Sequence, residues 1–404
     1  MYYDTWRPSD ALPFPLSDMT ANTVGDKIYL MGGCSSDQIG YVCPSISTDV
    51  FIYDVTKGTY ETLTNVLPRA RYRHATALIG TKLYLMGGRD LSDNIIEEVD
   101  IFETTDQTWT TSPYEWTSAQ SDNDAFVLDG KIYAIGGYDA TYTATDKTDI
   151  LEPDVGWTLG SAHTTIAPMT VTRGDFAVVE GDGDLVYAFG GWSDSNNFCT
   201  PLTSAEVYDP SADTWTAIAD LEVGRGDKAS GALHGRIFAV GGENQVSCDS
   251  SGSSVPLAAA AVTDVEAYNP STDKWEVVAD MPESAFRFAS ATWKNTIFIF
   301  GGQKTARFCV KYNASCNELI NATWGFTEEA QNDRDGLPAG AIAGIVIACM
   351  VAVFAAVTFI RRGGACACGG NSSAPSRDAI EVNQNQLRKF KANDAGDFEA
   401  GPNN

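Results

Sequence analysis

Five arginines recur at fixed positions ahead of a repeated glycine pair, and their guanidinium groups are well suited to binding an anion. Arg71, Arg173 and Arg225 lie 16, 17 and 16 residues before the first glycine of the pair that follows them. Arg73 and Arg287 each lie 14 residues before theirs. A guanidinium donates two parallel hydrogen bonds to a carboxylate, sulfate or phosphate. If the repeat brings the five together, we expect a cationic cluster that binds an acidic peptide or an anionic glycan.

A second interpretation gives the same arginines a structural role, in which they bond carbonyls and acids of adjoining loops and hold the repeats together. Two of them begin Arg-Gly-Asp triplets, at residues 173–175 and 225–227. On an animal cell-surface protein this triplet suggests integrin binding. Both copies fall at one repeat position and lead into an expected strand, which favours a place inside a loop over a protruding adhesive tip.

The sequence offers no other set of residues for catalysis or metal binding. Its three histidines are His74, His163 and His234, and we cannot assemble a metal or radical site from them. The acidic runs at 121–124 and 181–184 lack the spacing of a calcium loop. We therefore predict no catalytic residue, no metal and no cofactor.

The element that positions the arginines is a short hydrophobic run ending in two glycines, as in residues 82–88. Its β-branched and aromatic residues predict a buried strand, and the glycine pair indicates a close approach of backbone or ring that leaves no room for a Cβ. The first glycines of the copies are Gly32, Gly87, Gly136, Gly190, Gly241 and Gly301. An aromatic residue precedes the second glycine of each pair by 27 to 34 residues: Trp6, Tyr60, Trp109, Trp157, Trp215 and Trp275.

These two landmarks, spread over residues 2–325, resemble the kelch repeat, which is a four-stranded propeller blade of about 50 residues. The resemblance implies an all-β, six-bladed kelch-type propeller over residues 1–325. In the second blade we expect strands at 74–79, 82–88, 97–102 and 107–111. Residues 2–8, with Trp6, are expected to close the last blade as its outermost strand; the rival is closure through Trp324.

The resemblance also bears on the arginines. Kelch-like blades often carry arginine at this place, which supports the structural interpretation. Some six-bladed kelch-like enzymes isomerise sialic acids with arginines and a carboxylate at the channel mouth, so a glycan-active enzyme remains an alternative.

Charge and cysteine content limit the kinds of partner and the cellular compartment. A net charge of -26 argues against nucleic acid, because a protein that neutralises phosphates needs a basic face. Six cysteines precede residue 320, all in loops after glycine pairs. We predict that they pair as Cys34–Cys43, Cys199–Cys248 and Cys309–Cys316, which implies an oxidising compartment. The alternative is six unpaired thiols in the cytosol.

The C-terminal part has the features of a membrane anchor. After a linker at 326–338, residues 339–360 are uncharged and are followed by two arginines, which predicts a single transmembrane α-helix with residues 361–404 as a disordered cytoplasmic tail. The propeller is then extracellular or lumenal. Two sequons at Asn313 and Asn321 agree with this topology, although residues 1–6 lack the features of a signal peptide. An extracellular propeller therefore requires a leader removed from, or missing at, the start of this sequence.

Two further predictions concern the anchor. Cys366 and Cys368 follow the span and are candidates for palmitoylation. Small residues repeat every four positions in the span at Gly340, Gly344 and Ala348, a pattern that lets two helices approach closely and form a homodimer. The sequence as a whole predicts a single-pass membrane protein that recognises a protein or glycan ligand through propeller face loops. A cytosol-facing, membrane-tethered scaffold is the remaining alternative.

Overall fold

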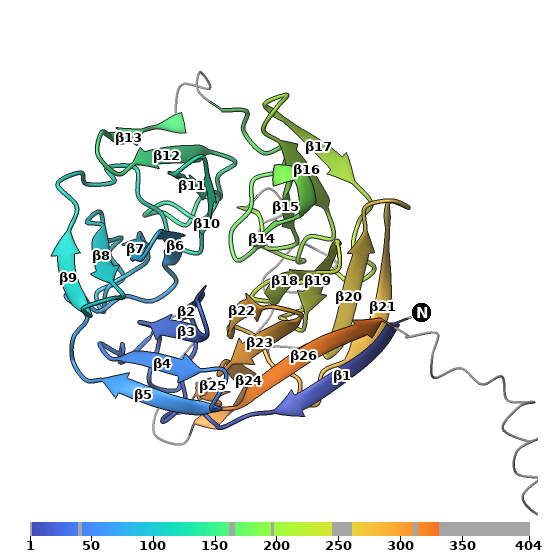
Figure 1. Ribbon diagram of the computed structural model, residues 1–404, viewed down its shortest axis with the longest axis horizontal. Helices are drawn as coiled ribbons and strands as arrows, with labels where there is room; N and C mark the ends of the chain where they lie inside the picture. Colours follow the sequence, from blue (N-terminus) through green and yellow to red (C-terminus); the bar gives the residue numbers. More distant parts are fainter. Residues whose placement is uncertain are drawn as a thin grey trace, which may run out of the picture. The chain divides into compact units, whose positions relative to one another are not determined.

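The computed structural model describes residues 2–38, 43–160, 166–194, 198–244, 261–309 and 314–330. Within this part of the chain, six four-stranded antiparallel sheets are arranged as blades around a central axis (Figure 1). The all-β, six-bladed propeller expected from the repeat is therefore confirmed.

The first five blades each run from the innermost to the outermost strand in chain order. Blade one comprises β2 (Thr20–Val24), β3 (Lys27–Met31), β4 (Val50–Asp54) and β5 (Thr59–Leu63). Blade two comprises β6 (Ala75–Ile79), β7 (Lys82–Met86), β8 (Asp100–Glu103) and β9 (Thr108–Thr111). Blade three comprises β10 (Asp124–Leu128), β11 (Lys131–Ile135), β12 (Thr148–Glu152) and β13 (Gly156–Thr158).

Blade four comprises β14 (Ala177–Glu180), β15 (Val186–Phe189), β16 (Ala205–Asp209) and β17 (Thr214–Ile218), with the short 3-10 turn η2 (Asp182–Asp184) between its first two strands. Blade five comprises β18 (Ala229–Leu233), β19 (Arg236–Val240), β20 (Asp264–Asn269) and β21 (Lys274–Asp280). The bounds expected for blade two agree with the observed strands to within one residue, except that β7 ends two residues earlier and β8 begins three residues later than expected.

The sixth blade joins the two ends of the propeller. Its strands in order are β22 (Ala289–Trp293), β23 (Thr296–Phe300), β26 (Thr323–Ala330) and the N-terminal β1 (Tyr2–Pro8). β1 runs antiparallel to β26 at the edge of this sheet (Figure 1), with Trp6 opposite Phe326 and Pro8 opposite Trp324. Trp324 thus lies in the third strand and Trp6 in the outermost one. A hairpin of β24 (Gln303–Cys309) and β25 (Ala314–Leu319) is inserted between β23 and β26.

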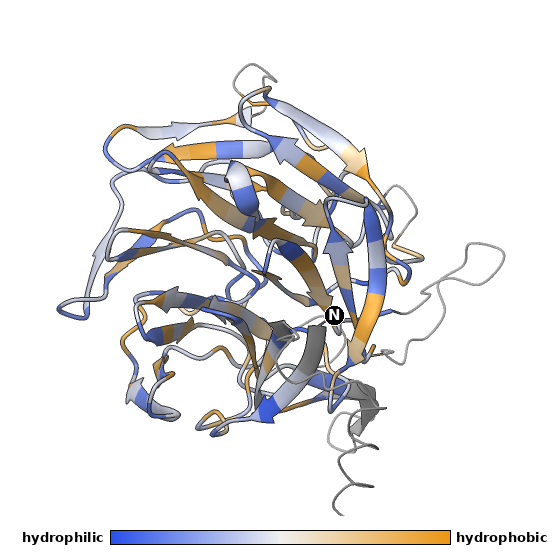
Figure 2. Cartoon of the chain, turned by 45° about the vertical axis from the view of Figure 1, so that its right-hand side comes forward, coloured by the Kyte–Doolittle hydropathy of each residue, from blue (hydrophilic) through white to orange (hydrophobic). Residues whose placement is uncertain are grey.

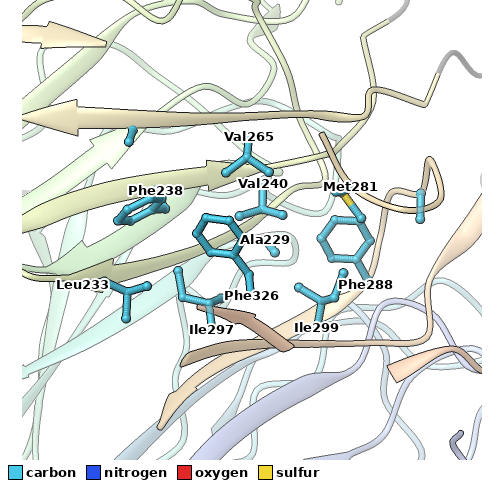
Figure 3. Packing of buried hydrophobic residues seen from close by; sticks show 12 residues of the cluster. Ala229, Leu233, Phe238, Val240, Val265, Met281, Phe288, Ile297, Ile299 and Phe326 are labelled. Atoms are coloured by element: carbon cyan, nitrogen blue, oxygen red, sulfur yellow. The ribbon is translucent and has the colours of Figure 1, made fainter. Parts of the chain in front are cut away.

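Hydrophobic residues are concentrated on the inner strands, whereas the outer strands carry more hydrophilic residues (Figure 2). β15 and β19 are buried throughout, whereas β5 and β9 contain no buried residue. The core consists of clusters between neighbouring blades. In one of them, between blades five and six, Phe238 and Val265 face Ile297 and Phe326 (Figure 3).

The glycine pairs mark the points where one blade meets the next. A Cβ on Gly87 (φ +64°) would lie 2.2 Å from the carbonyl oxygen of Gln120 in the following blade. The amide of the second glycine donates a hydrogen bond to that same oxygen, with 2.9 Å between Gly88 N and Gln120 O. Equivalent bonds occur at the other five junctions: Gly33 to Arg71, Gly137 to Arg173, Gly191 to Arg225, Gly242 to Ala285 and Gly302 to Leu16. The last of these joins blade six to blade one.

The predicted membrane span at 339–360, with Gly340, Gly344 and Ala348, lies outside the described residues, as do Asn313, Cys248, Cys366 and Cys368. Among the residues that are described, no helix has the length and apolar character needed to cross a bilayer. The anchor, its lipidation and its pairing therefore stay predictions.

Candidate functional site at the propeller axis

Three of the five arginines are buried inside their own blades. Arg71, Arg173 and Arg225 are each 0% exposed. Arg71 contacts Asp100 at 2.6 Å and Arg173 contacts Glu206 at 2.9 Å. Arg225 forms the same ion pair with Glu266, which is likewise buried.

The same three guanidinium groups also donate to carbonyl oxygens at the glycine pairs. Arg71 donates to Gly87 O at 3.1 Å, and Arg173 to Gly190 O at 2.8 Å. Arg225 donates to Gly241 O at 3.0 Å. Each arginine thus fixes the loop before an innermost strand to the second and third strands of its blade. This geometry corresponds to the structural interpretation, and it leaves no exposed Arg-Gly-Asp triplet because both triplet arginines are fully buried.

The other two arginines lie at the axis, where they belong to a ring of six charged residues. One residue comes from each blade, just before the innermost strand, and we call the set the axial ring: Asp18, Arg73, Asp122, Asp175, Asp227 and Arg287. All six have left-handed backbone conformations, with φ between +50° and +56°. This shared conformation turns their amide and carbonyl groups toward the neighbouring blades.

Backbone hydrogen bonds link the axial ring into a closed circuit. The amide of each member donates to the carbonyl of the member in the preceding blade, at distances of 2.8 to 3.0 Å. The circuit closes where Asp18 N donates to Arg287 O at 2.9 Å. Because an L-residue with positive φ costs about 1–2 kcal/mol, six in one circuit indicate that the arrangement is enforced by the packing of the blades.

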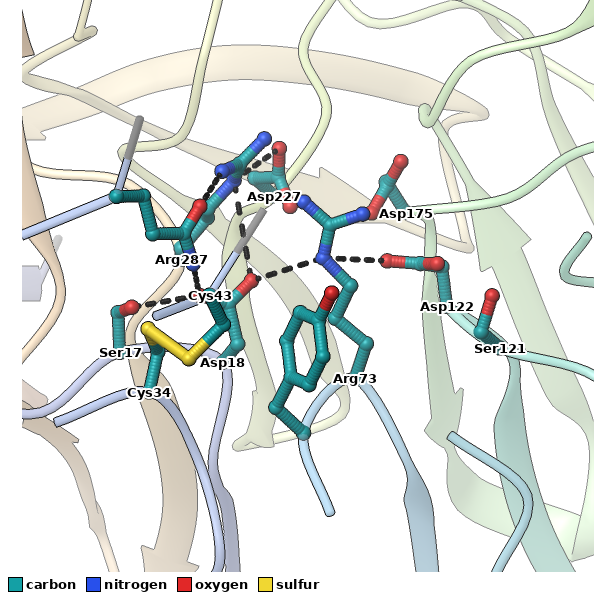
Figure 4. Close-up of polar contacts among 12 residues, drawn as sticks. Ser17, Asp18, Cys34, Cys43, Arg73, Ser121, Asp122, Asp175, Asp227 and Arg287 are labelled. Atoms are coloured by element: carbon teal, nitrogen blue, oxygen red, sulfur yellow. Dashed lines mark hydrogen bonds and ion pairs between the residues drawn. A yellow bond between two sulfur atoms is a disulfide. The ribbon is translucent and has the colours of Figure 1, made fainter. Parts of the chain in front are cut away.

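Acids outnumber bases at the axis, so the expected purely cationic cluster is not what the structure shows. Arg73 Nε lies 3.4 Å from both Asp18 and Asp122, and Arg287 Nε lies 3.3 Å from Asp227 (Figure 4). The side chains of these five residues are at most 9% exposed. The sequence-based prediction considered only the arginines, whereas the same register places four aspartates between them.

Residues directly after the glycine pairs also belong to this network. Gln303 donates to Ser17 Oγ at 2.8 Å, and Tyr138 OH donates to Asp175 at 2.9 Å. Glu243, which is 5% exposed, shares a hydrogen bond with Asp227. Each of these three residues occupies the position immediately after its glycine pair and forms a β-bridge with the residue preceding the ring member.

Three carboxyl groups of the network, those of Asp18, Asp175 and Glu243, have raised pKa values, and burial is the largest cause for each. Burial and the negative charges of Asp122 and Asp227 raise the pKa of Asp175 well above its ordinary value. Burial, together with Asp227, raises the pKa of Glu243 to about 7 despite the opposing effect of Arg287. Burial alone would also raise the pKa of Asp227, but Arg287 and Arg73 hold it below its ordinary value. The network therefore combines protonated donors with an ionised acceptor.

The raised pKa of Glu243 predicts a contribution to stability that falls as pH rises. Between pH 4.5 and about 7 the folded protein holds a proton on Glu243 that the unfolded chain releases, so this contribution is greatest at the acid end and is lost as pH rises through about 7. The Glu243→Gln variant should lack this contribution, which amounts to roughly 2–3 kcal/mol between pH 4.5 and 8. Urea unfolding of both proteins at pH 5, 6, 7 and 8 measures the difference, and two parallel curves would contradict the assignment.

Loops on the same face are held by a further arginine that the sequence analysis did not single out. Arg89, 0% exposed, donates to Ser121 Oγ at 2.8 Å and to Asp139 O at 2.9 Å in blade three. Its guanidinium lies 3.8 Å from the ring centroid of Tyr142. Tyr142 OH in turn donates to Asp93 at 2.8 Å. The loops after the second strands of blades two and three are thus fixed to each other.

The described part of the chain also places several predicted covalent sites. Cys34 and Cys43 are joined by a disulfide in the loop after the first glycine pair. Cys199 is disulfide-bonded as well, and Cys248, its predicted partner, lies outside the described residues. The backbones of Cys309 and Cys316 lie in β24 and β25, with their side chains outside the described part. Asn321 is exposed just before β26 and donates to Leu12 O at 3.2 Å.

A spacing in the sequence could have revealed the buried ion pairs. Asp100, Glu206 and Glu266 each lie nine residues before the anchoring tryptophan of their blade, Trp109, Trp215 or Trp275. In blade one the corresponding residue is Phe51 and the arginine position holds Leu16. Blade three has the buried Asp149 at the corresponding place on its third strand but Gln120 at the arginine position. In blades two, four and five, however, the acid at this spacing accompanies the arginine, which is the signal of a structural pair there.

Six blades with glycine pairs, inter-blade hydrogen bonds and buried arginine–acid pairs define a kelch-type β-propeller. The chain belongs to the Attractin/LZTR1 beta-propeller family, whose model matches residues 28–306. It is similar to Kelch-like protein 23 of Homo sapiens, with 29% identity over 136 residues, or 34% of this chain and 22% of the relative. An F-box/kelch-repeat protein of Arabidopsis thaliana is 35% identical over 113 residues, or 28% of this chain and 27% of the relative.

The solved structure titled "Structure of YjhT" superposes with a TM-score of 0.63 at 14% identity, covering 80% of this chain and 99% of that one. At this identity the likeness shows the fold alone. The matched segment spans about a quarter or less of the curated relatives' length. What those whole proteins do is therefore not transferred to this chain.

Proposed function

We propose that this protein is a membrane-anchored recognition module whose propeller lies on the extracellular or lumenal side and binds a protein ligand. The ligand would contact the face that carries the loops after the glycine pairs, here called the glycine-pair face. The observation that carries the proposal is the bracing of these loops by the buried Arg89, which contacts two blades at once. Loops that are ordered before binding lose little conformational entropy when a ligand docks.

The placement of the arginines favours a protein ligand over an anionic glycan or a glycan-active enzyme. Arg71, Arg173 and Arg225 already neutralise buried acids. Arg73 and Arg287 are flanked by aspartates that would repel an anion. A propeller that acts as a protein-interaction module needs no catalytic residue at its axis, and its face loops supply the specificity.

The topology of the proposal rests on independent features. The Cys34–Cys43 disulfide supports an oxidising compartment. Asn321 is exposed on the propeller and begins a sequon, and the uncharged span of residues 339–360 follows soon after. The two arginines after the span favour a cytoplasmic C-terminus.

The topology is tested by treating the full-length protein from its native cell with N-glycosidase. We expect a faster-migrating product, and the Asn321→Gln variant should lose part of the shift. Asn371 begins a sequon beyond the span, so Asn371→Gln should leave the shift unchanged. No shift for the wild type, together with reactive thiols at Cys34 and Cys43, would place the propeller in the cytosol and overturn the receptor proposal in favour of the scaffold.

Recognition itself is tested by proximity labelling at the surface of the same cells. A specific partner should be labelled by the wild type and lost with Arg89→Met, which releases the braced loops. A partner that is labelled equally by both proteins would place the binding surface elsewhere.

A further inference from the structure

The loop after the first glycine pair carries a buried glutamine into the axial ring. Gln38 is 0% exposed. Its amide nitrogen donates to Asp18 at 2.6 Å, and its amide oxygen accepts a hydrogen bond from Arg287 at 2.5 Å. A carboxylate only accepts hydrogen bonds and a guanidinium only donates them, so one amide satisfies both groups. Gln38 therefore joins the ring members of blades one and six, where the propeller closes.

A disulfide closes this loop on both sides of the glutamine. Cys34 precedes Gln38 by four residues, Cys43 follows it by five, and the two cysteines are joined. Both cysteines are buried, at 0% and 1% exposure. The amide of Cys34 also donates to Ser17 O at 2.7 Å. Because Ser17 directly precedes Asp18, the disulfide is attached to the ring member that Gln38 contacts (Figure 4).

The disulfide and the contacts of Gln38 order the same segment. A cross-link reduces the number of conformations open to the residues that it encloses. Among the described residues, the segment between the cysteines also contacts Ser45 and Leu319, through Ser35 at 2.8 Å and Asp37 at 3.1 Å. If the disulfide is cut, these contacts and those of Gln38 must overcome the conformational entropy of the loop without it. The disulfide and the bonds of Gln38 therefore support each other.

Release of Gln38 would change the ring without breaking it. Asp18 and Arg287 lie 3.8 Å apart, with side chains that are 3% and 7% exposed. Arg287 would retain Asp227 at 3.3 Å, and the backbone circuit of the ring does not involve Gln38. Water would, however, reach the two charged side chains that Gln38 contacts. The ring thus has a second arrangement, in which these charges are open to the glycine-pair face.

We infer that the Cys34–Cys43 disulfide is a redox-sensitive switch of the axial ring, which holds Gln38 in place when oxidised and releases it when reduced by a dithiol. In the reduction, one thiolate of the dithiol attacks a disulfide sulfur and its second thiol displaces the mixed disulfide. The protein gains two electrons and two protons as two thiols, and the dithiol becomes a cyclic disulfide. The switch concerns the ring itself and holds whichever ligand the glycine-pair face binds.

The test uses the reciprocity of coupled equilibria. If the disulfide stabilises the position of Gln38, the contacts of Gln38 must stabilise the disulfide by the same factor. Purified full-length protein is equilibrated with graded ratios of reduced to oxidised dithiothreitol, and the thiols of Cys34 and Cys43 are counted by alkylation and mass spectrometry. In Gln38→Ala the midpoint should move by about tenfold toward the thiol form, because hydrogen bonds to charged groups are the stronger ones.

Two controls accompany this measurement. The disulfide of Cys199, followed in the same samples, should keep its midpoint in Gln38→Ala. Asn295→Ala, which removes an exposed amide from the turn between β22 and β23, should leave the Cys34–Cys43 midpoint unchanged. Equal midpoints for the wild type and Gln38→Ala, or cysteines at 34 and 43 that remain thiols after oxidation, would overturn the inference.

Opening of the ring is measured separately by amide hydrogen exchange. The double variant Cys34→Ser/Cys43→Ser represents the reduced state without affecting other disulfides. In it the amide of Asp18 should exchange faster relative to that of Leu83, a buried residue of β7 whose exchange reports global unfolding. Adding Gln38→Ala to the double variant should cause no further change. An unchanged ratio in the double variant, or a further increase on adding Gln38→Ala, would show that the disulfide does not act through Gln38.

Discussion

Replacing Gly87 by alanine is expected to destabilise the propeller by about 2–5 kcal/mol. The new Cβ would lie 2.2 Å from Gln120 O, 3.1 Å from the Trp116 ring and 3.3 Å from Asn123 Oδ1, and the backbone oxygen cannot move without breaking its bond from Gly88 N. Overpacking of this kind costs roughly 1–3 kcal/mol, and the positive φ adds about 1–2 kcal/mol.

Gly80 provides a matched control for this substitution. Its φ of +62° is nearly that of Gly87, but nothing lies within 4 Å of the point that a Cβ would occupy there. Gly80→Ala should therefore cost only about 1 kcal/mol, the backbone term less the entropy lost by the unfolded chain. Urea unfolding of the two variants separates the contact from the backbone strain. Equal losses would show that the inter-blade contact at Gly87 contributes nothing.

Replacing Arg225 by methionine is expected to cost about 3–5 kcal/mol, the usual effect of leaving a buried charge unpaired. Glu266 is 0% exposed and, among the described residues, would retain only the amides of Glu222 and Val223 as side-chain partners. Gly241 O would lose the bond from Arg225 at the same time, and Asp264 O would keep only the one from the amide of Gly241 in this part of the chain. The loop before β18 should then detach from its blade.

The control for this variant is Lys131→Met, which removes an exposed ion pair with Glu152 and should cost less than about 1 kcal/mol. In the double variant R225M/E266Q the unpaired carboxylate of residue 266 is absent, so part of the lost unfolding free energy should be recovered. Unfolding midpoints measure all three proteins. A loss for Arg225→Met no larger than that for Lys131→Met would mean that the buried pair does not stabilise the blade.

The repeat was readable from the sequence because each blade obeys the same local constraints. Gly87 and Gly88 must lack a Cβ, and Trp109 must reach the core from an outer strand. The glycine pair and the aromatic residue therefore recur at a nearly constant spacing. The six-bladed fold and the repeat position of the arginines could be predicted on this basis, and a structural role was one of the two interpretations. The choice between the two roles could not be made, because the partner acids lie on the third strand, beyond loops of variable length.

The loops explain why the ion pairs were missed. Arg71 and Asp100 are 29 residues apart, Arg173 and Glu206 are 33 apart, and Arg225 and Glu266 are 41 apart. Because these separations differ, counting residues from the glycine pair does not locate the acid. The axial ring could not be recognised in the sequence for another reason. Its position is occupied by Asp in four blades and by Arg in two, so a search for repeated arginines finds only two of its members.

The pairing of β1 with β26 sets an order on biosynthesis. Tyr2–Pro8 is synthesised before the other strands of the propeller, whereas its partner strand, which ends at Ala330, is synthesised after them. Five blades can assemble from local hairpins while β1 remains unpaired. Pairing between the most distant parts of the chain is intrinsically slow, and β26 presents an open edge until it happens. The nascent chain therefore needs β1 protected until β26, the last strand of the propeller, has been synthesised.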